Sequence, residues 1–208
     1  MGKTLAQMTA EIREVNIEKG WRPAGGGPGS NTFGDYVALL HSEVSEALEA
    51  YRDHRLEDAT GEFGEGECTC AMSESSMVSC SVHGYDALPK PEGVGSELAD
   101  VLIRLLDMCD VFGLVVFDPD MELDDVADWP NVGAQLDRLK SFGDWISWMH
   151  GFIAAFGGGI KRASTVLRSL VTLAERHGID LTAEYERKVA FNRTRAFQHG
   201  GRTMADTP

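Results

Sequence analysis

Basic residues are scarce in this sequence: its 208 residues include 19 Lys and Arg but 33 Asp and Glu, so the formal net charge is −14. A strongly negative chain is repelled by the phosphates of a nucleic-acid duplex and by an anionic membrane surface. We therefore expect neither as the main partner. A small anionic substrate stays compatible with this charge if metal ions accompany it.

Long apolar runs are lacking as well. The most apolar window, residues 145–160, contains His150 and four glycines, so it is too short and too interrupted to cross a bilayer. The first residues show no charged start followed by an apolar run, so we expect no signal peptide. These two absences predict a cytoplasmic protein without a membrane partner.

Cysteine is also rare, and four cysteines in a chain of this size do not indicate a disulfide framework where no export signal is present. Three of them lie within sixteen residues together with a histidine: Cys68, Cys70, Cys80 and His83. Three thiolates and an imidazole form a tetrahedral set for a structural Zn²⁺ ion. The alternative is a loop whose cysteines are incidental. Cys109 stands apart within a helical pattern, where we expect a small core residue.

No segment shows the alternating pattern of a β-strand, whereas apolar residues recur at helical spacing along much of the chain. This periodicity predicts a single all-α domain that spans residues 1–208. The expected helices cover residues 4–20, 33–55, 96–112, 134–156, 160–177 and 181–194. Ser96 is the expected N-cap of the third helix. Residues 56–95 are rich in Gly, Ser, Cys and Pro with little periodicity, so we expect an inserted Cys/His loop module there.

Two of these helices carry pairs of acids three residues apart: Glu43 with Glu46, and Glu97 with Asp100. Residues at this spacing are neighbours on one helix surface. Glu43 lies within an apolar face, where an ionised carboxylate is costly unless it is paired or binds a metal. For the helix at 96–112 alone, a solvated acidic face is the alternative. Together the two pairs could surround one or two divalent cations, and ligation by oxygen alone favours Mg²⁺ or Mn²⁺.

The metal type and a set of C-terminal side chains both indicate phosphate chemistry. Protein-bound Mg²⁺ keeps several waters and binds phosphates, which favours hydrolysis of a phosphate ester or anhydride. Lys188, Asn192 and Arg195 lie at i, i+4 and i+7 on one expected helix face, where they could hold a polyphosphate. A basic helix end that is favoured by the helix dipole is the alternative for these residues.

The sequence also contains a weak internal repeat. Residues 32–41 align with residues 141–150, with Phe, Gly, Asp and His in common, and residues 101–114 align with residues 166–179. The four acids of the first copy are replaced in the second, in order, by Phe152, Ala155, Arg162 and Thr165. We therefore predict that residues 134–177 form a degenerate second hairpin, which packs with the first as a pseudo-symmetric four-helix bundle. Chance similarity between amphipathic helices is the alternative.

The acid pairs, with their flanks and the C-terminal motif Lys188-x-x-x-Asn192-x-Thr-Arg195, resemble the all-α nucleotide pyrophosphohydrolases. This is the MazG-like and dimeric-dUTPase-like superfamily, and the likeness to its actinobacterial and phage members covers residues 10–55, 90–113 and 178–202. The resemblance implies hydrolysis of a nucleoside triphosphate to a monophosphate and pyrophosphate, with Mg²⁺ as the cofactor. It also implies roles for residues of this chain: the four acids Glu43, Glu46, Glu97 and Asp100 as Mg²⁺ ligands, and Lys188, Asn192 and Arg195 as phosphate contacts.

The chain departs from the simplest members of that superfamily in two respects. Fifty residues separate Glu46 from Glu97, and a second hairpin follows the first. The simple members dimerise to complete a four-helix core, so the sequence leaves open whether this chain forms a homodimer or supplies the partner itself. Which carboxylate activates the water is also open, with Glu46, at the edge of the apolar face, as the preferred candidate.

The base pocket is the least certain part of this interpretation, and its candidates are Asn16, Lys19, Trp21 and Phe33. Two alternatives to a general nucleoside triphosphate pyrophosphohydrolase follow. One is an enzyme of the same fold restricted to dUTP, dCTP or a modified nucleotide. The other is a non-catalytic helical module that binds nucleotides or a protein partner, with zinc as its only metal.

Overall fold

The structure is a computed structural model that describes residues 2–53, 79–80, 85–86, 90–114, 118, 120–127, 133–156 and 161–197. Of the predicted zinc ligands, Cys68, Cys70 and His83 lie outside this part of the chain, and only the backbone of Cys80 lies within it. The zinc site and the inserted module at 56–95 therefore stay predictions.

The described residues are mainly helical, which confirms the all-α class. Six helices of 13 to 20 residues form most of the structure: α1 (Leu5–Glu18), α2 (Phe33–Arg52), α3 (Gly93–Val111), α5 (Phe142–Ala154), α6 (Lys161–Arg176) and α7 (Leu181–Thr194). The four-residue helix α4 (Gly133–Leu136) and a 3₁₀ turn (Asp124–Val126) connect α3 to α5. Within the described part of the chain, the only strand pair joins β1 (Ser79–Cys80) to β2 (Tyr85–Asp86). None of the described helices is long and apolar enough to cross a membrane.

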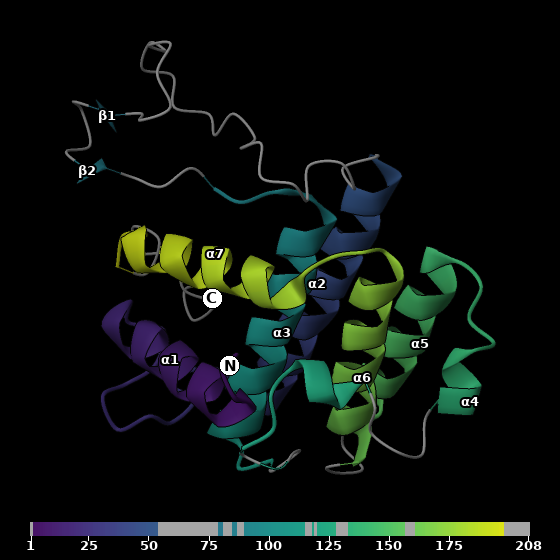
Figure 1. Cartoon of the computed structure of the whole chain (residues 1–208). Helices are drawn as coiled ribbons and strands as arrows, with labels where there is room; N and C mark the ends of the chain where they lie inside the picture. Colours follow the sequence, from purple (N-terminus) through teal and green to yellow (C-terminus); the bar gives the residue numbers. More distant parts are fainter. Residues whose placement is uncertain are drawn as a thin grey trace, which may run out of the picture.

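Helix α3 lies at the centre of the fold (Figure 1) and buries 15 of its 19 residues. It packs against α2, α6, α7 and α1, while α2 also packs against α5, and α5 against α6. Four helices, α2, α3, α5 and α6, thus each contact two others of the set side by side. The remaining two long helices, α1 and α7, cover the face of α3 that these four leave open.

The helix starts follow local sequence signals. Thr32 and Ser141 each form a capping box, in which the hydroxyl accepts the N–H of the third helical residue, and that residue's carboxylate accepts the cap N–H. The partners are Asp35 for α2 and Asp144 for α5. Lys140 N–H also donates to Asp144, and this cap starts a new helix at Phe142. The predicted helix at 134–156 is therefore wrong as a single element, because α4 and α5 are separated.

Ser96 is not the N-cap that the sequence predicts. Helix α3 begins one turn earlier, at Gly93 after Glu92, so Ser96 lies inside the helix and is fully buried. Its hydroxyl donates to the carbonyl oxygen of Pro91 at 2.8 Å. A serine inside the first turn can satisfy its hydroxyl by bonding to a nearby backbone carbonyl, which removes its need for a cap position.

Local features recur at aligned positions of the α2–α3 and α5–α6 hairpins. The rings of Phe33 and Phe112 meet edge to face at 5.0 Å, and the aligned pair Phe142 and His177 does so at 5.5 Å. Both α3 and α6 are followed by a glycine with positive φ, Gly113 at 62° and Gly178 at 68°, a conformation that glycine adopts without strain. The aligned His41 and His150 stack on each other across α2 and α5, with their Nδ1 atoms 2.6 Å apart.

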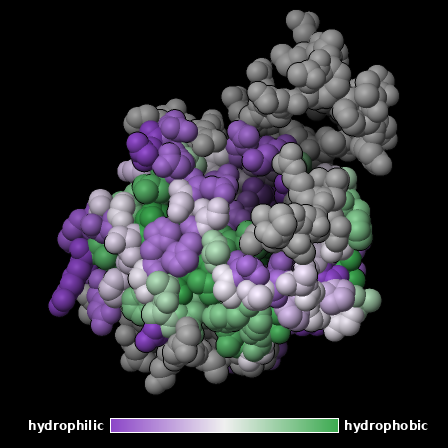
Figure 2. Space-filling model, turned by 180° about the vertical axis from the view of Figure 1, so that it is seen from behind, coloured by the Kyte–Doolittle hydropathy of each residue, from purple (hydrophilic) through white to green (hydrophobic). Residues whose placement is uncertain are grey.

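The surface on the far side of the molecule from the view of Figure 1 is uneven in polarity. Figure 2 shows hydrophilic side chains gathered around a hollow in the upper part of this face, with hydrophobic side chains concentrated below it. Among the described residues, Phe197 is the one large hydrophobic side chain that is strongly exposed. The apolar side chains are otherwise collected in a single core that includes residues of all six long helices.

Candidate active site

Three carboxylates from α2 and α3 converge inside the protein. One oxygen each from Glu43, Glu97 and Asp100 lies within 4.8 Å of the others, an arrangement that could hold a metal ion. Glu43 is 9 % exposed and Glu97 8 % exposed, whereas Asp100 is half-buried. The structure thus brings together three of the four predicted acid ligands, and their oxygens are the donors that Mg²⁺ and Mn²⁺ prefer.

The fourth predicted ligand, Glu46, lies outside this group. Its side chain is exposed, and its Oε1 accepts a hydrogen bond from Ser42 Oγ at 3.1 Å. Residues three apart on a helix point about 60° away from each other, which is enough to take Glu46 from the buried face to its edge. Glu46 nevertheless lines the same pocket as the three clustered acids.

The acids meet because α2 and α3 run antiparallel. Glu43 contacts Arg104 and Tyr36 contacts Phe112, so positions that advance along α2 retreat along α3. The burial of Glu97 follows from the central position of α3, because other helices cover most of its surface. The prediction that 96–112 could present a solvated acidic face is wrong, because Glu97 and Asp107 are buried.

Two cations of the protein already contact the cluster. Arg104 Nε donates to Glu43 Oε1 at 3.0 Å, and Lys188 Nζ lies 2.6 Å from Asp100 Oδ2. Lys188 is only 2 % exposed and also donates to Ser96 Oγ at 2.8 Å. Two of the three carboxylates are therefore paired, whereas no described residue donates a hydrogen bond to the carboxylate of Glu97.

Burial changes the acidity of the two most enclosed acids. Desolvation raises the pKa of Glu97 to about 7, against the opposing effect of Lys188 and with a further increase from Asp100. Desolvation also raises the pKa of Glu43, and Arg104 opposes this change. An uncompensated carboxylate is costly at this depth, so a bound divalent cation would favour the ionised form of both groups.

A pocket of about 870 Å³ opens on the cluster. All the acids, phosphate contacts and base contacts predicted from the sequence line it, with the exception of Phe33: Glu43, Glu46, Glu97, Asp100, Lys188, Asn192, Arg195, Asn16, Lys19 and Trp21. They come from α1 and the loop that follows it, from α2, from α3, and from α7 and its end. Phe33 packs instead against Phe112 and does not line this pocket.

The α7 side of the pocket differs in detail from the predicted helix face. Helix α7 ends at Thr194, and Arg195 has an extended backbone with φ −67° and ψ 148°. The guanidinium of Arg195 lies over the Phe191 ring and near the Asn192 side chain. Arg195 therefore reaches the pocket from beyond the helix, whereas Lys188 is held inside by Asp100 and Ser96.

The sequence interpretation missed a second buried ion-pair group behind the acid cluster. Arg22 is 4 % exposed, and its Nη1 lies 3.1 Å from Asp107 Oδ1 and 2.7 Å from Asp110 Oδ2. Arg13 contacts Asp110 from the other side. Asn16 hydrogen-bonds the side chain of Asp107. Arg22 stands in a Gly- and Pro-rich loop without periodicity, so no local signal distinguished it.

Comparisons of the chain with models of protein families, with curated proteins and with solved structures found no match. The geometry of the pocket and its acids, together with the motifs in the sequence, therefore carries the functional conclusion.

Proposed function

We propose that this protein is a Mg²⁺-dependent nucleoside triphosphate pyrophosphohydrolase, which converts a (deoxy)nucleoside triphosphate to its monophosphate and pyrophosphate. The observation that carries the proposal is the group of Glu43, Glu97 and Asp100, whose oxygens lie within 4.8 Å of one another at a nucleotide-sized pocket. The motifs that resemble the all-α pyrophosphohydrolases supply the reaction class. Mn²⁺ is the alternative metal, since it prefers the same donors.

The deep burial of the Glu97 carboxyl group supports a cation at this position. Its carboxyl group is nearly buried, its pKa is about 7, and no described residue hydrogen-bonds to it. Arg104 and Lys188 pair the other two acids and so hold them in place for a ligand. Lys188 and Lys90 act on Glu97 through their charge, and a bound metal ion would add direct ligation of this buried carboxylate.

We assign a role in the reaction to each residue from its position in the pocket. Bound Mg²⁺ would supply charge neutralisation at the triphosphate and a more acidic water. Water attack breaks the bond between the α-phosphorus and the bridging oxygen, pyrophosphate leaves, and the water proton passes to a carboxylate. We assign that proton to Glu46, which is exposed and lines the pocket. Arg195 and Lys19 line the pocket and supply positive charge for phosphate oxygens.

The opposite wall of the pocket is the proposed base site. Trp21 contributes an aromatic residue to this wall, and Asn16 hydrogen-bonds the side chain of Asp107. The backbone N–H groups of Trp21 and Arg22 both donate to the carbonyl oxygen of Asn16, at 2.8 and 3.0 Å. This wall is therefore rigid, as a site that selects among bases requires. A restriction to dUTP or dCTP would reside here.

We further propose that the α5–α6 hairpin is a degenerate copy of α2–α3, so that one chain builds its own four-helix bundle. The matched capping boxes, the matched ring pairs and the two terminal glycines support this duplication. His41 and His150 are aligned residues that contact each other, as residues beside a twofold axis must. A self-contained bundle removes the need for a homodimer.

Pyrophosphate release from a panel of nucleoside triphosphates tests the activity. Wild-type protein with Mg²⁺ should release pyrophosphate and one monophosphate, with no free orthophosphate. Glu43→Gln should lower kcat/KM by about a hundredfold or more, since even residues around a metal site cost 10- to 100-fold. Glu49→Gln, on the exposed face of the same helix, is the control and should retain full activity.

A wild-type protein that releases no pyrophosphate from any nucleotide in the panel would defeat the proposal in favour of the non-catalytic module. Release restricted to dUTP or dCTP would identify the narrower enzyme. Equal activity of wild type and Glu43→Gln would show that the acid cluster does not carry the reaction.

A further inference from the structure

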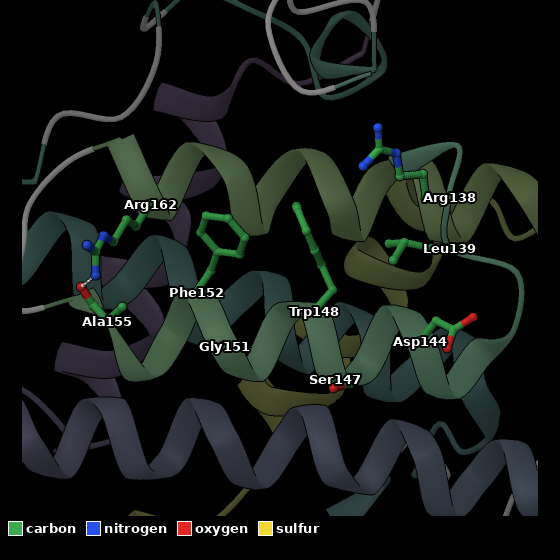
Figure 3. Close-up of a pocket in the computed structure, with 9 residues that line it drawn as sticks. All are labelled: Arg138, Leu139, Asp144, Ser147, Trp148, Gly151, Phe152, Ala155 and Arg162. Carbon is green, nitrogen blue, oxygen red and sulfur yellow. Dashed lines mark hydrogen bonds between the residues drawn. The ribbon is translucent and has the colours of Figure 1, made fainter. Parts of the chain in front are cut away.

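A second pocket, of about 690 Å³, lies on the α5–α6 hairpin and the segment that precedes it. Figure 3 shows its lining. Two arginines, Arg138 and Arg162, and two aromatic residues, Trp148 and Phe152, dominate it, with Asp144 at one edge. Its volume falls within the range that small-molecule sites occupy.

This pocket occupies the position that corresponds to the acid site on the first hairpin. Four of its residues, Trp148, Phe152, Ala155 and Arg162, align with Leu39, Glu43, Glu46 and Glu97. All four of those counterparts line the first pocket. The three acids among them have been replaced by a ring, a methyl group and a guanidinium. The second pocket therefore has lost every carboxylate at these positions and has gained a positive charge.

The two aromatic side chains form a fixed surface on which a flat ligand could bind. Trp148 and Phe152 project from α5 toward α6 side by side (Figure 3), with ring centroids 4.8 Å apart. Trp148 Nε1 donates to Ser169 Oγ at 3.0 Å, and Ser169 in turn donates to the carbonyl oxygen of Thr165 at 2.7 Å. Both rings stay partly exposed. A fixed, partly exposed ring binds another ring with little loss of side-chain entropy.

The two arginines lie at opposite ends of this aromatic pair (Figure 3). Arg162 donates to the carbonyl oxygen of Ala155, which orients its guanidinium at one end, and Arg138 is exposed at the other. The Asp144 carboxylate accepts the N–H groups of Lys140 and Ser141, both at 2.9 Å, as part of the α5 cap. In a chain with a net charge of −14, this pocket is locally cationic, which favours an anion.

We infer that the α5–α6 pocket is a second ligand site that binds a nucleotide without a metal ion. The base stacks against the Trp148 ring, with Phe152 beside it. The exposed guanidinium of Arg138, at one end of the pair, binds the phosphate, and Arg162, at the other end, donates to the edge of the base. The reversal of charge relative to the first pocket explains why no cation is needed here. The inference goes beyond the proposed activity and does not depend on it, because binding at this site involves no chemistry.

Calorimetric titration of the full chain with adenosine monophosphate in the presence of EDTA tests the inference. Wild-type protein should bind the nucleotide, and adenosine and inorganic phosphate should each bind at least about tenfold more weakly, because each lacks one half of the recognition. Arg138→Ala and Arg162→Gln should each weaken binding by about tenfold, which corresponds to about 1.4 kcal/mol. Lys140→Ala is the control: Lys140 is exposed two residues from Arg138 and does not line the pocket, so its removal should leave the affinity unchanged.

Arg138 is exposed, so its replacement leaves folding intact and the test stays decisive even if Arg162→Gln is unstable. No binding of adenosine monophosphate to the wild type in EDTA would overturn the site. An unchanged affinity in Arg138→Ala would do so as well, and so would a loss in Lys140→Ala as large as that in Arg138→Ala, since that would indicate a nonspecific charge effect. Failure of pyrophosphate release by the wild type, in contrast, would leave this binding result untouched.

Discussion

The α2–α3 and α5–α6 hairpins have similar helix ends and differ in the charge of the residues at aligned pocket positions. Both begin with a capping box and end with a glycine of positive φ. The α2–α3 hairpin places three carboxylates within 4.8 Å of one another, whereas the aligned positions on α5–α6 are Phe152, Arg162 and Thr165. The shared features stabilise helices and their packing, and of the residues that differ, Phe152 and Arg162 line the second pocket. Fold and chemistry are therefore separable within one chain, because caps and core positions tolerate changes in pocket residues.

Substitutions at core positions of the two hairpins should change the free energy of unfolding most, so they test this comparison first. Leu40 on α2 and Met149 on α5 are aligned and fully buried. Leu40→Ala and Met149→Ala should each lower the free energy of unfolding by about 2–5 kcal/mol. Because α2 packs against α5, both variants should unfold in one transition when urea denaturation is followed by circular dichroism and by tryptophan fluorescence.

Two separate unfolding transitions in either variant would contradict a single four-helix bundle, because the second hairpin would then unfold as an independent unit. A loss confined to Leu40→Ala would have the same meaning. As a control, Glu49→Ala, at an exposed position on α2, should change the free energy of unfolding by no more than about 0.5 kcal/mol.

The buried acid Glu97 of the first hairpin predicts a pH dependence of the stability. The pKa of Glu97 is about 7 in the folded protein, above its ordinary value of 4.5. Between these two pH values, folded Glu97 keeps a proton that the unfolded chain has lost. The contribution of Glu97 to the free energy of unfolding should therefore fall as the pH rises from about 4.5 to about 7, by about 3 kcal/mol, and should be constant above pH 7.

Urea denaturation in EDTA at several pH values measures this effect. Glu97→Gln should flatten the decrease, because glutamine does not titrate, and should make the metal-free protein more stable at pH 7.5 than the wild type. Saturating Mg²⁺ should raise the stability of the wild type above pH 7 and leave that of Glu97→Gln almost unchanged. An identical pH profile for the two proteins would contradict the assignment of the raised pKa to Glu97.

The capping boxes give the smallest expected effect and the closest match between hairpins. Thr32 Oγ accepts the N–H of Asp35 at 3.2 Å, and Ser141 Oγ accepts the N–H of Asp144 at 3.1 Å. Thr32→Ala and Ser141→Ala should each cost about 1 kcal/mol in free energy of unfolding. Thermal denaturation would show a similar decrease in Tm for both. A cost at one cap alone would show that the two helix starts are not equivalent.

Local patterns predicted much of this structure. The bounds of α7 agree with those expected from periodicity, and α2 begins at Phe33 as expected. The burial of Glu43 was predicted from the apolar residues around it on one helix face. Each of these features depends on residues a few positions apart, which the sequence displays directly.

Features that depend on distant residues were predicted poorly. Ser96 resembles a helix cap, but its partners are Pro91 and Lys188, and the second lies 92 positions away. The role of Arg104 follows from Glu43 on another helix. The buried position of Arg22 likewise follows from Asp107, 85 positions along the chain. Such pairs form only when the helices pack, and no local spacing reveals them.

Titration of the protein with Mn²⁺, followed by calorimetry, tests the central claim most directly, since Mn²⁺ accepts the oxygen ligands that Mg²⁺ prefers. The wild type should bind Mn²⁺ at the cluster of Glu43, Glu97 and Asp100, and the exposed-acid control Glu49→Gln should bind it equally well. Glu97→Gln should lose this binding, because it removes the one carboxylate of the cluster to which no described residue donates a hydrogen bond. Equal Mn²⁺ binding by Glu97→Gln and the wild type would contradict the proposal that α2 and α3 form the metal site.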